Sequence, residues 1–512
     1  MVDPRPPGFS LAHDGAACVK IKSFWGRRPF NRPAALRRPR RGRWLVVHIP
    51  VMYEASSRVA RRLRTWSIGS RWSAAVVLGA AAYLSWLGIA AVSAQRAVDP
   101  SHAPSAWAGS QPQDLTIKLV TFGPGDDVFN YFGHNAMIVE DRAQGVARLY
   151  NFGMFHFGPD MLPNYMKGKL TFWVGESPVR ATFQHYKRNN RSIRVQELNL
   201  TPARRKVIAD ELARAALPEN REYLYDHFFN NCSTRLRDLV DLAVMGQFKD
   251  GLDHAARMTY RQHIRRYAQR DPITDFGLVF WMNDFMERHI KQWDELFLPE
   301  ELEHQVARAH YRNEFGQNVA LVETSYVVYE ATDRQAAPEW PNHSWVGGGF
   351  VGGLIALVVV LTALWAYRSR DAWSLRVLGL WHALFGLALG LPGLLGALMW
   401  AFTEHTVTYR NENLFLSNPL TFALCPLGVA MLFGSTRATR WARAICYLLA
   451  ASSLLLLPLK LLPGFVQDVS FPMSVLLPAN LGFALAHRIL LARSVARAQP
   501  LNDAGGEAVP SA

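Results

Sequence analysis

Cysteine is scarce in this chain of 512 residues, which has only four: Cys18, Cys232, Cys425 and Cys446. The sequence has no CxxC pair and no HExxH motif. A zinc site that uses His227 and Cys232 therefore has no paired motif behind it. From the sequence we expect no metal and no other cofactor.

Excess basic charge is also scarce once the first 71 residues are set aside. The net charge is +15, but residues 1–71 hold 16 Lys and Arg against three acidic residues, and the remaining 441 residues sum to +2. Arg-rich and Pro-rich sequence cannot build a core, so we expect residues 1–71 to be a disordered basic cytoplasmic tail. It either binds anionic lipid or precedes a later start such as Met52. Nothing in this tail resembles a folded nucleic-acid-binding module.

Long apolar runs are abundant, and six are long enough to cross a bilayer. They lie at residues 72–92, 345–367, 377–401, 418–434, 444–462 and 470–491. Arginines gather beside the first run and in alternate loops, which predicts the cytoplasmic side. We therefore expect a first transmembrane helix at 72–94, an outside domain at 95–343, a five-helix transmembrane domain at 344–492 and a disordered cytoplasmic tail at 493–512. We favour a retained first helix, although small residues near Ala94 leave cleavage open.

The outside domain mixes strand and helix patterns. Segments typical of strands lie at 115–122, 137–140, 148–152, 171–174 and 319–329. A helix is expected from about 202 to 216, and residues 222–316 are mostly helical by pattern. This mixture predicts an α+β domain.

Cys232 is the only cysteine that this topology places outside, so it has no disulfide partner within the chain. The apolar residues after it recur at helical spacing: Leu236, Leu239, Val240 and Ala243. A helix that begins near Cys232 would stabilise a thiolate through its amide groups and dipole. The alternative is a buried structural thiol.

Thiol catalysis needs a base and a group that orients the base. His134 is the best candidate base, because it begins a predicted strand directly after Gly133, where another group can come close. Asn151 is the candidate orienting group, since it lies on the strand expected to pair with that of His134. Tyr150 and Asn130 remain alternatives for this role, and His134 itself could be a structural histidine.

Candidate substrate-binding residues lie near these groups. The backbone amide of Cys232 and the side chain of Asn231 would stabilise an oxyanion at the helix start. Three residues are near enough in sequence to line a pocket, although each could equally be a surface or capping residue: Tyr225, Thr234 and Arg235. A polar loop at the outer membrane face adds three further candidates: His405, Asn411 and Asn413.

Three motifs resemble a known family: Phe132-Gly133-His134-Asn135-Ala136, Tyr150-Asn151-Phe152-Gly153, and residues 223–235 with Asn231-Cys232-Ser233-Thr234. They resemble the extracytoplasmic domain of the Lnb family of lipoprotein intramolecular transacylases. Histidine before cysteine is similar to the permuted NlpC-type branch of the papain-like fold. The resemblance implies an α+β papain-like domain joined to an all-α transmembrane bundle, in the plasma (inner) membrane of a bacterium.

The resemblance also implies a membrane-bound acyltransferase that works through a thioester. The Cys232 thiolate would attack the sn-2 ester of a lipoprotein diacylglyceryl group, and His134 would protonate the leaving alcohol. The acyl chain would then pass to the N-terminal amine. The expected partners are diacylated lipoproteins or phospholipid in the membrane, and no nucleic acid. Two alternatives remain, namely a cysteine amidase or peptidase acting on peptidoglycan or another envelope substrate, and a non-enzymatic envelope protein in which Cys232 is structural.

Overall fold

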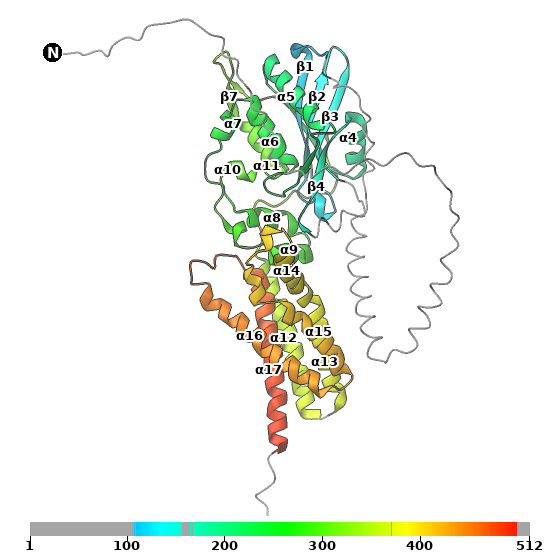
Figure 1. Cartoon of the computed structure of the whole chain (residues 1–512), viewed down its shortest axis with the longest axis vertical. Coiled ribbons are helices and arrows are strands. Elements are labelled where there is room, and N and C mark those ends of the chain that lie inside the picture. The colour runs from blue at the N-terminus through cyan, green and yellow to red at the C-terminus, as the bar shows by residue number, and fades with distance from the viewer. Residues whose placement is uncertain (1–106, 108, 156–163, 165–166, 370, 499–512) are drawn as a thin grey trace, which may run out of the picture. The chain divides into compact units, whose positions relative to one another are not determined.

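The computed structural model describes residues 107, 109–155, 164, 167–369 and 371–498. The basic tail at 1–71, the first transmembrane helix at 72–94 and the tail beyond residue 498 lie outside the described residues. The interpretations of these three segments from the sequence stay predictions. The described chain forms a sheet domain followed by a bundle of long apolar helices (Figure 1).

The sheet domain is built on seven antiparallel strands. In spatial order they are β6 (Glu222–Leu224), β4 (Thr171–Pro178), β3 (Val146–Met154), β2 (His134–Asp141), β1 (Leu115–Phe122), β5 (Ile193–Leu198) and β9 (Val322–Tyr329). Along β1, Ile117 and Leu119 face one core while Val120 and Phe122 face another. Because successive side chains of a strand point to opposite faces, this apolar sequence requires cover on both sides of the sheet.

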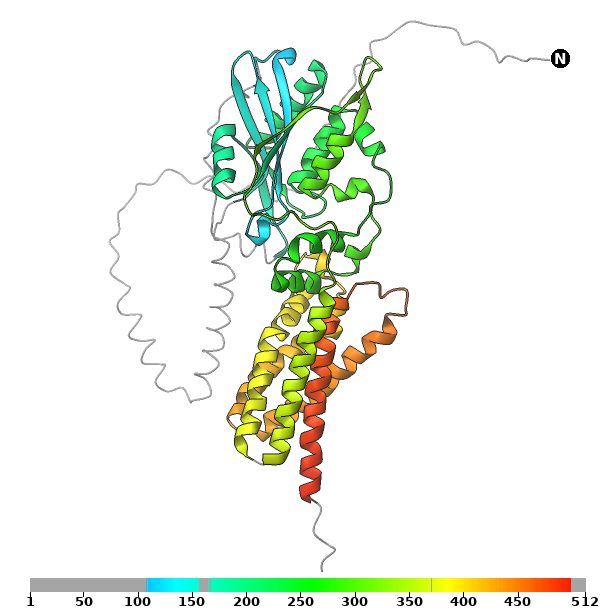
Figure 2. The ribbon, with the colours of Figure 1, turned by 180° about the vertical axis from the view of Figure 1, so that it is seen from behind.

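Helices supply that cover on both faces. Leucines and other apolar residues of α5 (Pro202–Ala216), α6 (Cys232–Ala243) and α11 (Pro299–Arg308) pack on one face. On the other face lies α4 (Val179–Arg188), whose Phe183 and Tyr186 pack against Phe122. Figures 1 and 2 show these two layers from opposite sides. The α+β architecture predicted from the sequence is thus present as a sheet-rich domain.

The remaining elements of this domain are short. They are η2 (Pro112–Asp114), η3 (Val128–Asn130), α7 (Gln247–Asp250), α8 (Tyr260–Ala268), α9 (Pro272–Trp281), η4 (Asp284–Glu287), α10 (Gln292–Glu295), β7 (His310–Arg312) and β8 (Asn318–Ala320). Aromatic and aliphatic residues of α8 and η4 form a separate core around Phe228 and Phe297. This third core includes Phe228 and so holds the segment just before α6 in place.

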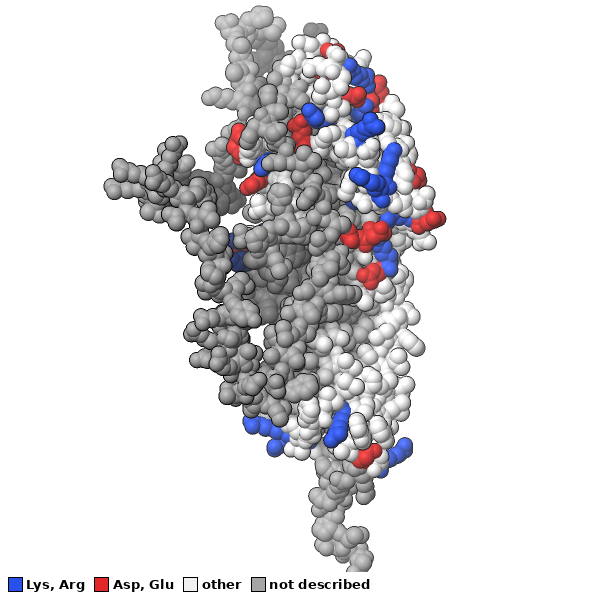
Figure 3. All heavy atoms as spheres, turned by 90° about the vertical axis from the view of Figure 1, so that its right-hand side faces the viewer, with Lys and Arg blue, Asp and Glu red and all other residues white. Residues whose placement is uncertain are grey.

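Five apolar spans follow, as the sequence predicts: Ser344–Ser369, Ala372–Phe402, Glu412–Leu432, Thr436–Leu459 and Ser470–Ala492. They contain α12 (Ser344–Ser369), α13 (Ala372–Ala388), α14 (Gly390–Phe402), α15 (Pro419–Leu432), α16 (Thr436–Leu459) and α17 (Ser470–Ala498). The second span is divided at Leu389, because Pro392 has no amide hydrogen to donate to the carbonyl of Ala388. Between these spans lie η5 (Thr406–Thr408) and η6 (Glu412–Phe415). On the face in Figure 3, the bundle surface is nearly free of charged side chains over most of its length, with Lys and Arg gathered at one end.

Partly buried hydrogen bonds join α9 and the residues after it to the bundle. The Trp281 indole donates to the carbonyl of Pro392 at 3.1 Å. The Asn283 amide donates to the carbonyls of Thr406 and Tyr409 at 3.0 and 2.9 Å. Two of these three acceptors lie in the loop between α14 and α15. The sheet domain and the bundle are therefore hydrogen-bonded to each other at this loop.

Candidate active site

The thiol of Cys232 lies at the first residue of α6. Asn231 caps this helix, since its side-chain oxygen accepts from the amides of Ser233 and Thr234, both at 2.9 Å. The Thr234 hydroxyl in turn accepts from the Asn231 amide at 2.8 Å. This capping box leaves the Cys232 amide outside the cap, where it points from the positive end of the helix.

His134 is the first residue of β2 and follows a glycine that no other residue could replace without strain. Gly133 has a φ of +80°, and a Cβ at that position would lie 2.8 Å from the Phe122 carbonyl oxygen. From β2 the imidazole reaches β3, where its Nε2–H donates to Asn151 Oδ1 at 2.6 Å. The two strands are antiparallel neighbours, which is why these residues meet.

The imidazole also lies close enough to the Cys232 thiol to lower the pKa of that thiol. Because Nε2 is engaged by Asn151, Nδ1 is the ring nitrogen left to interact with the sulfur. Burial raises the pKa of the Cys232 thiol, but the charge and hydrogen bond of His134 outweigh it. With further hydrogen bonds from the Asn135 amide and the Ser233 hydroxyl, the pKa falls to about 7. The sulfur is therefore poised between thiol and thiolate near neutral pH.

Asn135 was not among the residues selected from sequence, although it directly follows His134. It is fully buried, and its side-chain amide nitrogen donates to the Thr121 hydroxyl at 3.0 Å. Its carbonyl oxygen accepts from the Ser233 hydroxyl at 2.7 Å. Asn135 thus ties the start of β2 to the start of α6, which holds the imidazole beside the sulfur.

Tyr223, on β6, was also missed as a separate candidate. Its ring lies under the Arg235 guanidinium at 4.5 Å, and its buried hydroxyl has no hydrogen-bond acceptor among the described residues. Burial and the nearby Cys232 thiolate both raise the pKa of this phenol well above its usual range, so it stays protonated. An O–H group near a thiolate, with no acceptor of its own, is available to a substrate oxygen.

Two family comparisons match the chain. Residues 104–267 match the family model of the Lnb N-terminal periplasmic domain, and residues 349–493 match that of the Lnb transmembrane domain. Together these matches cover more than half of the chain, in the order expected for the family. The chain belongs to the Lnb family. It is a multi-pass membrane protein with a periplasmic domain. No curated protein and no solved structure matches it.

Tyr225, another residue selected from sequence in this Lnb family member, lies at the border of the site. Its ring stacks on Phe172 with 4.3 Å between centroids. A Cβ built on Gly153 would lie 3.8 Å from the Tyr225 ring and 4.0 Å from the Cys232 Cβ, so both residues border this glycine. Arg235 bonds the Asn230 side chain and covers Tyr223. Arg235 therefore contacts Tyr223, and it is the Tyr223 ring that borders the site.

The side chains of Asn231 and Thr234 are occupied by the structure of the helix start. Besides its cap, Asn231 donates its amide hydrogens to the carbonyls of His227 and Phe297, at 2.8 and 2.9 Å. Thr234 is 1% exposed. Their part in substrate binding stays a prediction, and the contacts show them shaping the turn that presents Cys232.

The predicted residues of the membrane loop divide into two groups. His405 belongs to a segment that contacts the sheet domain, because the Glu404 amide donates to the Lys167 carbonyl at 2.9 Å. Asn411 and Asn413 are buried and donate to the Phe280 carbonyl at 2.7 and 2.9 Å. The structure therefore brings the His405 segment to the turn before β4 and brings the two asparagines to α9. A substrate-binding role for these three residues stays a prediction.

Proposed function

We propose that this Lnb family member is a membrane-bound thiol acyltransferase that carries an acyl chain on Cys232. The donor in this proposal is the diacylglyceryl group of a bacterial lipoprotein, and the acceptor is the N-terminal amine of the same lipoprotein. One observation carries the proposal: the His134 imidazole bonds Asn151 Oδ1 at 2.6 Å and lowers the pKa of the Cys232 thiol beside it. A thiol at a helix start, packed on an antiparallel sheet that supplies the histidine and its orienting amide, also supports a papain-like interpretation of the domain.

In the first half of the reaction the Cys232 thiolate attacks the carbonyl carbon of the sn-2 ester. A C–S bond forms, the ester C–O bond breaks, and the imidazolium of His134 gives its Nδ1 proton to the leaving alcohol. Asn151 accepts a hydrogen bond from Nε2–H throughout the reaction. His134 therefore gains and loses its catalytic proton at the other ring nitrogen, Nδ1. The product is an acyl thioester and a free hydroxyl on the glycerol.

In the second half the α-amine of the lipidated cysteine attacks the thioester. The C–S bond breaks, an amide bond forms, and His134 takes the proton that the amine loses. The thiolate of Cys232 is regenerated next to the imidazolium. No oxidant, metal or nucleotide is required, because the acyl group stays activated as an ester or thioester until the amide forms.

Each half passes through a tetrahedral oxyanion. The Cys232 amide at the start of α6 and the Tyr223 hydroxyl are the two proposed donors to it. The amide is left free by the Asn231 cap, and the phenol has no competing acceptor. Donors that are already oriented stabilise the transition state without reorganisation.

The contacts with the bundle support a lipid substrate. The turn at 167–169 bonds Glu404 of the bundle, and the next residue, Leu170, accepts from the Tyr225 amide at 2.7 Å. Tyr225, which borders Cys232, is therefore connected to the bundle loop at Glu404 through hydrogen bonds to residues 167–170. Leu224 and Phe229, on either side of Tyr225, are 64% and 54% exposed. Exposed apolar side chains beside a nucleophile suit an acyl chain better than a hydrophilic peptide.

The test is mass spectrometry of a lipoprotein N-terminal peptide, from a host that lacks its own N-acylation step. Expression of the wild-type chain should convert the diacyl form to a lyso-form that carries an N-acyl group. Cys232→Ala should leave the diacyl form unchanged. Cys425→Ser, in α15 of the bundle, is the matched control and should convert the lipoprotein like wild type.

A diacyl lipoprotein that is unchanged by the wild-type chain would reject the transacylase. Loss of an acyl chain as free fatty acid, without N-acylation, would instead identify a hydrolase with the same nucleophile. An acyl group trapped on Cys232 and absent in His134→Ala would establish the thioester step itself.

A further inference from the structure

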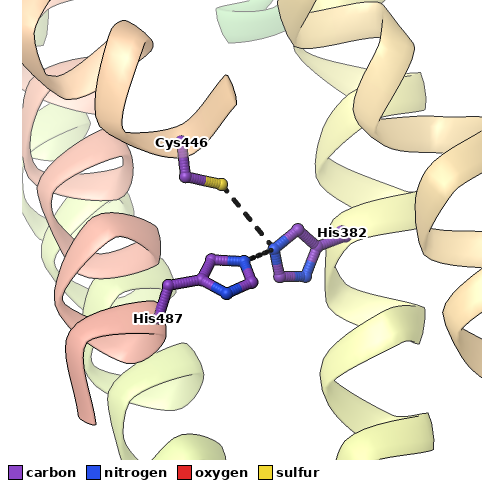
Figure 4. A group of neighbouring side chains, drawn as sticks. All are labelled: His382, Cys446 and His487. Carbon is purple, nitrogen blue, oxygen red and sulfur yellow. Dashed lines mark hydrogen bonds between the residues drawn. The ribbon is translucent and has the colours of Figure 1, made fainter. Parts of the chain in front are cut away.

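Three potential metal ligands meet inside the membrane bundle, far from Cys232 in the sequence. His382 comes from α13, Cys446 from α16 and His487 from α17, and their side chains point toward one another (Figure 4). Each is at most 1% exposed. Ionisable groups buried inside membrane-spanning helices are rare and usually functional, so a cluster of them indicates a specific role.

The cluster lies toward the cytoplasmic end of the membrane spans. Cys446 is ten residues after the start of α16, and His382 is ten residues after the start of α13. Both helices begin next to the arginine-rich loops of the cytoplasmic side. Arg443 precedes Cys446 by only three residues in α16, and Arg488 directly follows His487 in α17. The cluster is thus a separate centre from the periplasmic thiol.

The tautomer of His382 is set by its own helix. Its Nδ1–H donates to the Leu378 carbonyl at 2.8 Å, which leaves a lone pair on Nε2. That lone pair points at His487 Nε2, 2.9 Å away, and at Cys446 Sγ, 3.7 Å away. A ring N–H held by a backbone carbonyl is the usual support of a histidine that binds a metal.

Hydrogen bonds alone leave this cluster incompletely paired. His487 Nε2–H and the Cys446 S–H both approach the single lone pair of His382, and one lone pair accepts only one of them well. The other donor is then buried without a good acceptor, which costs free energy. An ion between the three atoms would use all three lone pairs at once.

The distances are close to those of a coordinated ion. With Zn–N of about 2.05 Å and Zn–S of about 2.3 Å, a tetrahedral ion sets nitrogen and sulfur ligands about 3.6 Å apart and two nitrogens about 3.3 Å apart. The observed sulfur–nitrogen distance is 3.7 Å, and the two nitrogens, at 2.9 Å, need to separate by only a few tenths of an ångström. All three atoms lie within 4.8 Å of one another.

We propose that His382, Cys446 and His487 form a binding site for a transition-metal ion that accepts imidazole and thiolate ligands, either Zn²⁺ or Cu⁺. On binding, the sulfur–hydrogen bond of Cys446 breaks, the proton leaves to solvent, and the thiolate and two neutral imidazoles coordinate the ion. The ion joins α13, α16 and α17 into one unit. This centre is independent of the acyltransferase proposal, because none of its residues contributes to the chemistry at Cys232.

The experiment uses the full-length protein, purified in detergent and depleted of metal. Samples are offered Zn²⁺ in one arm and Cu⁺ under reducing conditions in another, and bound metal is measured by plasma mass spectrometry. About one equivalent per chain is expected in the arm of the preferred ion. His382→Gln, His487→Gln and Cys446→Ser should each lose at least tenfold in bound metal. Cys425→Ser, a second buried membrane cysteine, is the matched control and should bind like wild type.

A spectroscopic measurement on the wild-type protein tests the site even if some variants fold poorly. Co²⁺ added to the wild-type protein should give a thiolate-to-cobalt charge-transfer band, and Cys446→Ser should lack it while Cys425→Ser retains it. Wild-type protein that binds less than a tenth of an equivalent in both arms would overturn the site. So would equal metal binding by wild type and all three cluster variants.

Discussion

His134 Nε2 lies 2.6 Å from Asn151 Oδ1, across the boundary between strands β2 and β3. This bond decides which ring nitrogen faces the sulfur, because a neutral imidazole that donates from Nε2 keeps its lone pair on Nδ1. It also prevents rotation of the ring away from Cys232. In the proposed mechanism this bond holds the imidazole in the orientation that general acid–base catalysis at the thiol requires.

Replacement of Asn151 tests this orientation. Asn151→Ala should slow formation of the Cys232 acyl thioester by about a hundredfold, since a misplacement of about 1 Å has that effect on a reacting group. The rate is measured by single-turnover acylation followed by intact-protein mass spectrometry. The control is Asn189→Ala, which removes another asparagine–histidine hydrogen bond, an exposed one to His185, and should not change the rate. Equal rates for both variants would show that the Asn151 bond does not orient the imidazole.

The pH dependence of thiol alkylation tests the ion pair. The pKa of Cys232 is lowered to about 7, so labelling by iodoacetamide should be half-maximal near pH 7 and fall as the pH drops further. One unit below the pKa, only about a tenth of the sulfur is thiolate. In His134→Ala the burial that raises the pKa is no longer opposed by the imidazole, so the midpoint should move upward. An unchanged midpoint in the variant would mean that His134 does not stabilise the thiolate.

Removal of the Tyr223 hydroxyl separates catalysis from stability. Tyr223→Phe should reduce turnover by about 10²- to 10³-fold, as expected for loss of an oxyanion donor. Its Tm should not fall, because the buried hydroxyl has no hydrogen-bond acceptor to lose among the described residues.

Tyr311→Phe is the matched control for that variant. The Tyr311 hydroxyl donates to the Asn199 carbonyl at 2.8 Å, away from the thiol. Its loss should cost about 1 kcal/mol of stability and leave turnover unchanged. Wild-type turnover by Tyr223→Phe would remove Tyr223 from the proposed oxyanion site.

The contact between the sheet domain and the bundle is tested at Asn283. Asn283→Ala leaves the carbonyls of Thr406 and Tyr409 without their donor. Acyl transfer from a lipid-bound donor should fall, whereas alkylation of Cys232 by a small soluble reagent should keep its wild-type rate. Asn313→Ala, in an exposed turn, should change neither measurement. A parallel loss of both activities in Asn283→Ala would show that the residue supports the fold rather than access to lipid.

Local sequence patterns were sufficient for part of the site. Apolar residues at helical spacing after Cys232 predicted a helix, and α6 begins at Cys232. Strand patterns predicted that Asn151 lies on a neighbour of the strand of His134, and β3 pairs with β2. These relationships depend on periodicity and on short connections, which are properties of nearby residues.

Other residues could not be placed from sequence. Tyr223 precedes Cys232 by nine residues, but only the pairing of β6 with β4 carries it to the edge of the site. Asn411 and Asn413 look like exposed loop residues in the sequence, whereas their amides are buried against α9. Burial and hydrogen-bond partners depend on which segments meet in space, which no local spacing records.

The sequence by itself determined the five described membrane spans, the sheet-rich periplasmic domain and the family, because long apolar runs, alternating strands and short motifs are written in consecutive residues. Only the tertiary structure decided that His134 Nε2 bonds Asn151, and that the Tyr223 hydroxyl has no acceptor among the described residues. It alone also brings His382 and Cys446, 64 residues apart in the chain, within 3.7 Å. The physical reason is that coordination and proton transfer act over a few ångströms, and helix packing, rather than chain order, sets those distances.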